Sequence, residues 1–178
     1  MTKKTLRIGI IGQSERPWEP LPEKTASVAF KTGLLIAKNG WHLYSGGRDG
    51  VMREASRGAK KVGGITVGIL PSLDKNEANE FVEIPITTGL GMSMRSELMI
   101  NTVDVVVMIG GKNGTLKELL TAYLFSKPIV VIKGSGGFAD SIENFLYEGK
   151  YIDDRKNVEI KFANSPEEAI EIIKKIFF

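Results

Sequence analysis

Val105-Val106-Val107-Met108-Ile109-Gly110-Gly111-Lys112-Asn113-Gly114-Thr115 begins as a run of apolar, mostly β-branched residues and ends as a glycine-rich turn. Short apolar runs of this kind are typical of strands that are buried on both faces of a parallel sheet. The residues that follow, 116–125, have a helical pattern of apolar positions. The segment therefore predicts a strand, a turn and a helix, which is the repeating unit of an α/β fold.

Strand-like and helix-like segments alternate along the whole chain. We expect strands at residues 6–12, 41–44, 65–70, 82–86, 105–109, 128–132 and 158–162, and helices at residues 23–38, 51–61, 94–101, 116–125, 139–147 and 166–177. This alternation predicts a single domain over residues 1–178, a Rossmann-like α/β fold with a doubly wound, mostly parallel sheet and helices on both faces. In such folds, ligands bind beyond the carboxyl ends of the strands.

The composition excludes several classes of protein. The chain has 178 residues, of which 42% are hydrophobic, which suits one well-filled core. It has no cysteine and one histidine, so we predict no disulfide, no cysteine nucleophile and no metal site. The net charge of +3 is small and spread along the chain, which makes nucleic acid an unlikely partner. No segment approaches the ~20 apolar residues that span a bilayer, so we expect a cytoplasmic protein without membrane contact.

Two glycine-rich turns predict the ligand site. The segments 45–50 (Ser-Gly-Gly-Arg-Asp-Gly) and 109–115 each follow an apolar run and open a helical pattern, and Arg95 lies between them. Glycines let the backbone approach a ligand closely, and a helix N-terminus attracts anions. We expect both turns at adjacent strand ends, facing one crevice that holds a nucleotide phosphate. The predicted ligand-binding residues are Gly12, Ser14, Gly46, Gly47, Gly50, Gly111, Lys112, Asn113, Gly114 and Thr115.

Neither turn matches a known nucleotide-binding fingerprint of high specificity. The first strand ends in Gly9-Ile10-Ile11-Gly12, which lacks the G-x-G-x-x-G spacing of dinucleotide sites, and no turn ends in the Gly-Lys-Ser/Thr of a P-loop. The simpler alternative is structural. The glycines would then only permit tight connections, Thr115 and Glu118 would form a capping box, and Arg95 would make a surface salt bridge.

Several motifs resemble those of a known family. The segments 45–70, 88–95 and above all 104–131 resemble the LOG-like proteins, once widely labelled "lysine decarboxylases". The family's core motif is an arginine in a Met-x-x-Arg setting followed by Pro-Gly-Gly-x-Gly-Thr-x-x-Glu. It aligns without a gap on Arg95 and Glu118. Gly110 replaces the motif's proline and Lys112 its second glycine. Ser96 replaces the lysine that follows the arginine in the cytokinin-activating branch.

The resemblance implies a Rossmann-like nucleotide-binding fold and two functions. The leading hypothesis is an enzyme, a phosphoribohydrolase that releases the base from a nucleoside 5′-monophosphate. Arg95 would orient the phosphate or ribose, and the Glu118 carboxylate would stabilise positive charge on the ribose ring. The alternative is a non-catalytic nucleotide or phosphorylated-pterin carrier near the molybdenum cofactor carrier branch. No cofactor is required in either case, and bound nucleoside monophosphate or phosphate is expected. The family also implies a homo-oligomer, at least a dimer.

Overall fold

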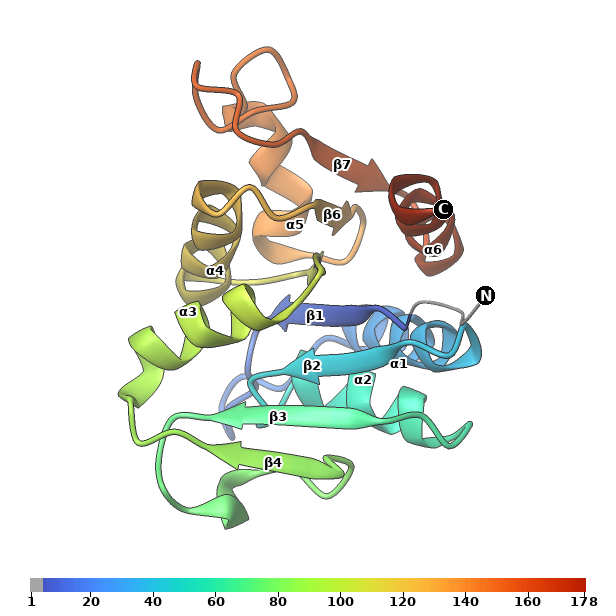
Figure 1. The fold of residues 1–178 in the computed structure, drawn as a ribbon, viewed down its shortest axis with the longest axis vertical. Helices are drawn as coiled ribbons and strands as arrows, with labels where there is room; N and C mark the ends of the chain where they lie inside the picture. The colour runs from blue at the N-terminus through green and yellow to red at the C-terminus, as the bar shows by residue number, and fades with distance from the viewer. Residues whose placement is uncertain (1–4) are drawn as a thin grey trace.

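The computed structural model describes residues 5–178 and consists of one seven-stranded sheet with helices on both faces (Figure 1). The strand order is β4-β3-β2-β1-β5-β6-β7, and all paired strands are parallel. The strands are β1 (Arg7–Gly12), β2 (His42–Ser45), β3 (Thr66–Leu70), β4 (Ile84–Thr87), β5 (Val105–Ile109), β6 (Ile129–Ile132) and β7 (Ile160–Ala163). The predicted doubly wound α/β fold is confirmed.

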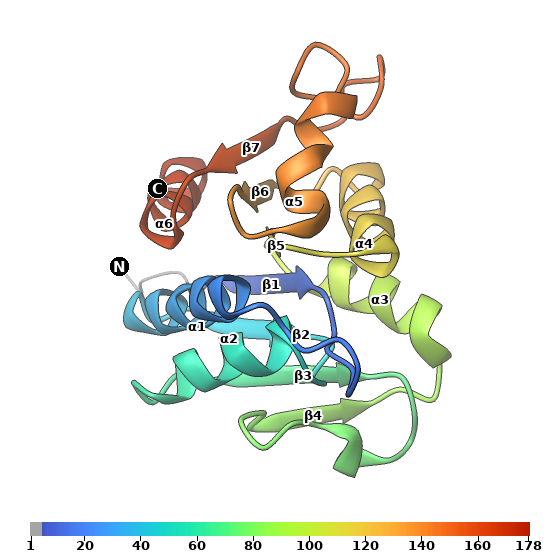
Figure 2. The same ribbon diagram turned by 180° about the vertical axis from the view of Figure 1, so that it is seen from behind.

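The helices form two layers. They are α1 (Glu23–Lys38), α2 (Val51–Lys60), α3 (Gly91–Thr102), α4 (Asn113–Leu124), α5 (Gly137–Ser141) and α6 (Pro166–Phe177). Helices α1, α2 and α6 cover one face of the sheet, and α3, α4 and α5 cover the other, as the two opposite views show (Figures 1 and 2). None of the helices in the described part of the chain is long and apolar enough to cross a membrane.

Strand β5 shows how the sequence builds both layers. Its five residues are all fully buried, as expected for a central parallel strand. Because side chains alternate along a strand, Val105, Val107 and Ile109 pack into the core beneath α1. Val106 and Met108 pack into the second core, beneath α3 and α4. Residues 105–109 are all apolar because both faces of β5 pack into a hydrophobic core.

The bounds of several predicted elements differ from the structure. The predicted helix 139–147 is a short helix, α5, followed by a 3₁₀ turn at Ile142–Phe145. The predicted helix 94–101 begins earlier, at Gly91. The predicted strand 82–86 is instead β4 at Ile84–Thr87, because the amide of Val82 turns back to the carbonyl oxygen of Asn79.

Helices α1 and α2 approach each other through glycine. A Cβ atom at Gly33 would lie under 3.0 Å from the carbonyl oxygen of Ala55, and one at Gly58 equally close to that of Phe30. The two backbones are therefore in direct contact, with no side chain between them at these points. Because α2 starts right after the first glycine turn, this contact also fixes the position of that turn.

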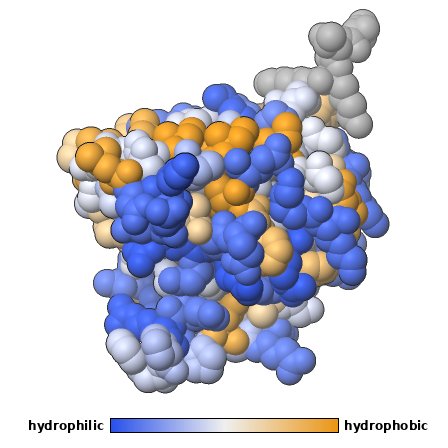
Figure 3. Space-filling view, turned by 90° about the horizontal axis from the view of Figure 1, so that it is seen from below, coloured by the Kyte–Doolittle hydropathy of each residue, from blue (hydrophilic) through white to orange (hydrophobic). Residues whose placement is uncertain are grey.

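One part of the sheet has less cover than the rest. The connection from β3 to β4 holds only the 3₁₀ turn Lys75–Glu77 and no α-helix. Ile84 and Ile86 of β4 are 45% and 40% exposed as a result. Figure 3 looks at the β4 edge and shows an apolar band along one side of it, beside a largely hydrophilic surface.

Candidate functional site

A pocket lies at the carboxyl ends of β1 and its neighbours. The chain leaves β1 toward β2 on one side, whereas β5 pairs with β1 on the other, so this is the point where the strand order reverses. Ligands of doubly wound folds bind at this point. The pocket has a volume of about 260 Å³, and its lining residues are Ile10, Ile11, Gly12, Ser14, Gly46, Met52, Met92, Ser93, Arg95, Ser96, Gly114, Thr115, Lys117 and Glu118.

Arg95, on α3, is the most unusual residue of the pocket. It is only 2% exposed, and its Nε and Nη1 atoms have no hydrogen-bond partner among the described residues. Its Nη2 atom lies 3.8 Å from the sulfur of Met92. Burial lowers the pKa of the guanidinium, although the nearby Glu118 acts in the opposite direction. The surface salt bridge considered for Arg95 is therefore wrong: the side chain is buried and has no carboxylate oxygen within ion-pair distance in this part of the chain.

A glycine makes room for this guanidinium. A Cβ atom at Gly46 would lie under 3.0 Å from Arg95 Nη1. Gly46 is the first glycine of the turn after β2, so the glycine turn shapes the pocket by admitting an arginine from another element. The sequence pattern suggested a turn that approaches a ligand, and the structure shows a turn that also makes room for a cation in the lining of the pocket.

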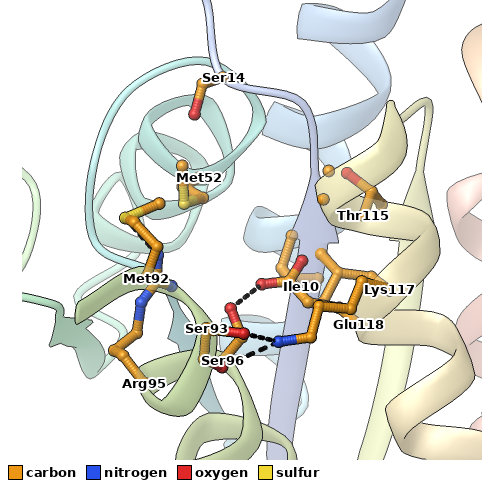
Figure 4. A pocket seen from close by; sticks show the side chains of 14 residues that line it. Ile10, Ser14, Met52, Met92, Ser93, Arg95, Ser96, Thr115, Lys117 and Glu118 are labelled. Carbon is orange, nitrogen blue, oxygen red and sulfur yellow. Dashed lines mark hydrogen bonds between the residues drawn. The ribbon is translucent and has the colours of Figure 1, made fainter. Parts of the chain in front are cut away.

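Glu118, on α4, faces Arg95 across the pocket (Figure 4). Its Oε1 atom accepts a hydrogen bond of 2.8 Å from the hydroxyl of Ser96. Burial raises the pKa of the Glu118 carboxyl, while the Ser96 hydrogen bond and the charge of Arg95 act against this rise. The proposed capping box is wrong, because α4 begins at Asn113 and Thr115 already lies inside its first turn.

The N-terminus of α4 forms one wall of the pocket through Gly114 and Thr115. The N-cap residue Lys112 makes no capping hydrogen bond with its side chain, and the first turn holds no acidic residue. The first amides of a helix have no acceptor within the helix. This end of α4 is therefore suited to bind an anion, since its amides and its dipole both favour negative charge.

The structure brings seven of the twelve predicted site residues to the pocket. These are Gly12, Ser14, Gly46, Arg95, Gly114, Thr115 and Glu118. The other five, Gly47, Gly50, Gly111, Lys112 and Asn113, do not line it. The amide of Gly111 donates to the side-chain oxygen of Gln13 at 3.3 Å. Lys112 forms an ion pair with Glu19.

Gly47 and Gly50 have structural roles that follow from their backbone. Both have positive φ angles, of 72° and 61°. A Cβ atom at Gly50 would lie under 3.0 Å from the carbonyl oxygen of Gln13, and one at Gly47 equally close to Gly68. These glycines let the turn pack against β3 and against the loop after β1. The two turns are also not on adjacent strands as predicted, because β2 and β5 flank β1 on either side.

Sequence reasoning missed half of the pocket. Ile10, Ile11, Met52, Met92, Ser93, Ser96 and Lys117 line it without having been predicted to do so. Three of them share α3 with Arg95. Met92 lies three positions before Arg95 and shares its face of the helix, so the true start of α3 at Gly91 would have suggested it. Ser93 and Ser96 lie two positions before and one position after Arg95, and helical spacing does not predict them.

Comparison with known proteins shows the family of this chain. The model of the SLOG cluster4 family matches residues 5–170. The chain belongs to this family. Its LOG-like character and its place near the molybdenum cofactor carrier branch, expected from the motifs, are confirmed by this match and by the relatives described next.

Three similar proteins are informative. The solved structure of the structural-genomics target TM1055 has 37% sequence identity and a TM-score of 0.91, covering 96% of this chain and 99% of that chain. The molybdenum cofactor binding protein from Rippkaea orientalis has 35% identity and a TM-score of 0.84, covering 99% and 100%. The cytokinin riboside 5′-monophosphate phosphoribohydrolase of Mycobacterium tuberculosis is 30% identical over 128 residues, 67% of this chain and 68% of that protein.

Proposed function

We propose that this SLOG cluster4 protein binds a phosphorylated heterocyclic small molecule in the pocket and holds it as a carrier, with a phosphorylated pterin of the molybdenum cofactor type as the ligand class. The observation that carries the proposal is Arg95, a buried guanidinium with two unpaired nitrogen atoms beside an uncapped helix N-terminus. Leaving a buried cation without a partner costs several kcal/mol, so a bound anion would offset that cost.

Each wall of the pocket has a separate task in this proposal. The amides at Gly114 and Thr115, with the Thr115 hydroxyl, are suited to hold a phosphate. Arg95 contributes positive charge from the opposite side. Met52 and Ile11 supply apolar surface on which a flat heterocycle can lie. A few polar groups for orientation and apolar surface for area are typical of small-molecule sites.

The state of Glu118 favours holding the ligand over cleaving it. Hydrolysis of an N-glycosidic bond needs an ionised carboxylate beside the developing positive charge. Burial raises the pKa of the Glu118 carboxyl and favours the neutral carboxylic acid, while the hydrogen bond from the Ser96 hydroxyl and the charge of Arg95 act in the opposite direction. The similarity to the Rippkaea orientalis cofactor-binding protein, which spans both whole chains, supports the same choice.

A second candidate function is phosphoribohydrolase activity on a nucleoside 5′-monophosphate. The observation in its favour is that Arg95 and Glu118, the two residues of the hydrolase motif, line one pocket on opposite walls. The mycobacterial phosphoribohydrolase relative supports it as well. In this case, positive charge on the ribose ring would lower the pKa of Glu118 and ionise it during the reaction.

One experiment separates the two functions. Purified protein is titrated calorimetrically with AMP and with a phosphorylated pterin, and the AMP, GMP, CMP and IMP mixtures are then analysed by chromatography for free base. The carrier proposal expects saturable binding and no release of base. Release that is lost in Glu118→Gln would establish the hydrolase instead. Absence of binding to either class of ligand would refute both functions.

A further inference from the structure

A second arginine stands next to the pocket and is not explained by a single phosphate. Arg48 belongs to the glycine turn after β2, and its Nη1 atom lies 3.7 Å from the sulfur of Met92. The Nη2 atom of Arg95 lies 3.8 Å from the same sulfur. Two guanidinium groups therefore converge on one atom, which is only a weak hydrogen-bond acceptor. An anionic oxygen at this position would reach both of them.

Neither arginine forms an ion pair among the described residues, although Glu118 and Glu77 attract Arg95 from a greater distance. No carboxylate oxygen lies within 4.0 Å of the Arg48 or Arg95 guanidinium in the described part of the chain, whereas Arg53 beside them pairs with Glu80 and Glu54. Burial is the main cause that lowers the pKa of Arg95, and the charge of Arg48 lowers it further. Glu118 and Glu77 act in the opposite direction. Two like charges held this close raise the free energy of the ligand-free protein, and an anion between them would remove that repulsion.

The surroundings provide room for such a group. Arg48 lines a second hollow of about 240 Å³ together with Asp49, Arg53, Glu77 and Asn79. The side chain of Met92, which is 54% exposed and unbranched, touches Arg48 and also lines the main pocket. Met92 also lies in the first turn of α3, which has no capping side chain and no acidic residue.

We infer that Arg48 and Arg95 form a second anion subsite, on the α3 side of the pocket, and that the ligand carries a second anionic group in addition to the phosphate held at α4. The inference rests on the proposed function, since it takes the α4 N-terminus as the first phosphate site. It narrows the ligand class to molecules with two separated negative groups, such as bisphosphates or phosphate esters that also bear an oxyanion or carboxylate.

The test measures how affinity depends on the second group. Wild-type protein, Arg48→Gln and the control Arg57→Gln are titrated calorimetrically with AMP, ADP and adenosine 3′,5′-bisphosphate. Arg57 carries the same charge, but it pairs with Glu54 and lines neither space. We expect at least one ligand with the added phosphate to bind wild type about tenfold more tightly than AMP does. Arg48→Gln should abolish this gain and leave AMP binding within about twofold, and Arg57→Gln should keep it.

The outcomes separate this inference from the proposed function. If AMP binds but the added phosphate gives no gain, or if Arg48→Gln weakens all three ligands by the same factor, the second subsite is refuted and the phosphate site at α4 stands. If none of the three adenine nucleotides binds, the second subsite is refuted, and the proposed function is decided separately by the titration with a phosphorylated pterin. Thermal unfolding of each variant without ligand shows whether the variant is folded. If Arg48→Gln is misfolded, Arg48→Lys replaces it, because lysine keeps the charge but lacks the planar donors of arginine.

Discussion

The N-termini of α6 and α4 are built in opposite ways. Helix α6 is satisfied by its own sequence: the Ser165 hydroxyl accepts from the amide of Glu168 at 3.2 Å, Pro166 occupies the first turn, and two glutamates lie next to the helix dipole. Helix α4 has none of these features, and neither has α3. Among the α-helices of the described residues, α3 and α4 alone lack both a capping side chain and an acidic residue in the first turn, and both line the pocket. The comparison indicates that negative charge is missing at the helix ends where an anionic ligand is expected to supply it.

The largest effect is expected at Arg95, which lies on α3 and lines the same pocket as the N-terminus of α4. Arg95→Met should weaken binding of a phosphorylated ligand about 100-fold or more, because a buried charge-assisted contact is lost. The same change should raise the free energy of unfolding without ligand by about 1–4 kcal/mol, since a buried unpaired cation is replaced by an apolar side chain. Calorimetric titration and urea unfolding measure the two effects. Arg57→Met is the matched control, and unchanged affinity in Arg95→Met would contradict the site.

Installing a cap on α4 should make it resemble α6. Lys112 is the N-cap residue and has extended backbone angles, so an aspartate there can accept a hydrogen bond from the first turn. Lys112→Asp should stabilise the fold by about 1 kcal/mol and weaken anion binding about tenfold through repulsion. Lys112→Ser supplies a neutral cap, so it serves as the control that stabilises without adding charge. Equal affinities of the two variants would show that the α4 terminus does not hold the anion.

The pH dependence of stability tests the buried carboxyl across from Arg95. The pKa of Glu118 is raised in the folded protein, so the fold binds its proton more tightly than the unfolded chain does. The stability that this proton contributes is present below the ordinary glutamate pKa of about 4.3 and is lost as pH rises through the folded value. Urea unfolding of Glu118→Gln and wild type should show that the free energy of unfolding of the variant, relative to that of wild type, is higher at pH 7 than at pH 4. A constant difference would contradict the raised pKa.

The smallest effect is expected at the capped helix. Ser165→Ala should cost about 1 kcal/mol of stability because the amide of Glu168 loses its acceptor. Ligand affinity should stay within about twofold, since α6 lies on the opposite face of the sheet from α3 and α4. Thermal unfolding and the same titration measure both quantities. A loss of affinity here would show that general stability, and not the pocket, governs binding in the other variants.

The sequence predicted the fold well because local patterns determine it. The bounds of α1, β5 and α6 agree with the predicted ranges, since each has a continuous apolar pattern and clear end signals. The predicted helix at 139–147 was wrong in its bounds, because α5 already ends at Ser141 and the chain continues as a 3₁₀ turn over Ile142–Phe145.

The site was predicted only in part for a different reason. Glycine motifs identify backbone that comes close to something, but they do not say whether that is a ligand or another part of the chain. Gly46 faces Arg95 and the pocket, whereas Gly50 in the same turn packs against the loop after β1. Met92 belongs to the Met-x-x-Arg motif and Ser96 follows it, but the motif does not show which side chains line a pocket, since this depends on how α3 packs. The strand order, which sets β1 between the two turns, was equally beyond the sequence.

The contact between α1 and α2 has a consequence for how a ligand enters. Where Gly33 and Gly58 bring backbone against backbone, no side-chain layer can be compressed or rearranged. We therefore expect local opening of the backbone in the other layer, where α3 begins with a glycine and carries the flexible side chain of Met92. In hydrogen–deuterium exchange, we expect the amides of α1 and α2 to exchange only through global unfolding. The amides at the start of α3 should exchange through a local opening of low free energy, and this opening would let the ligand enter the pocket.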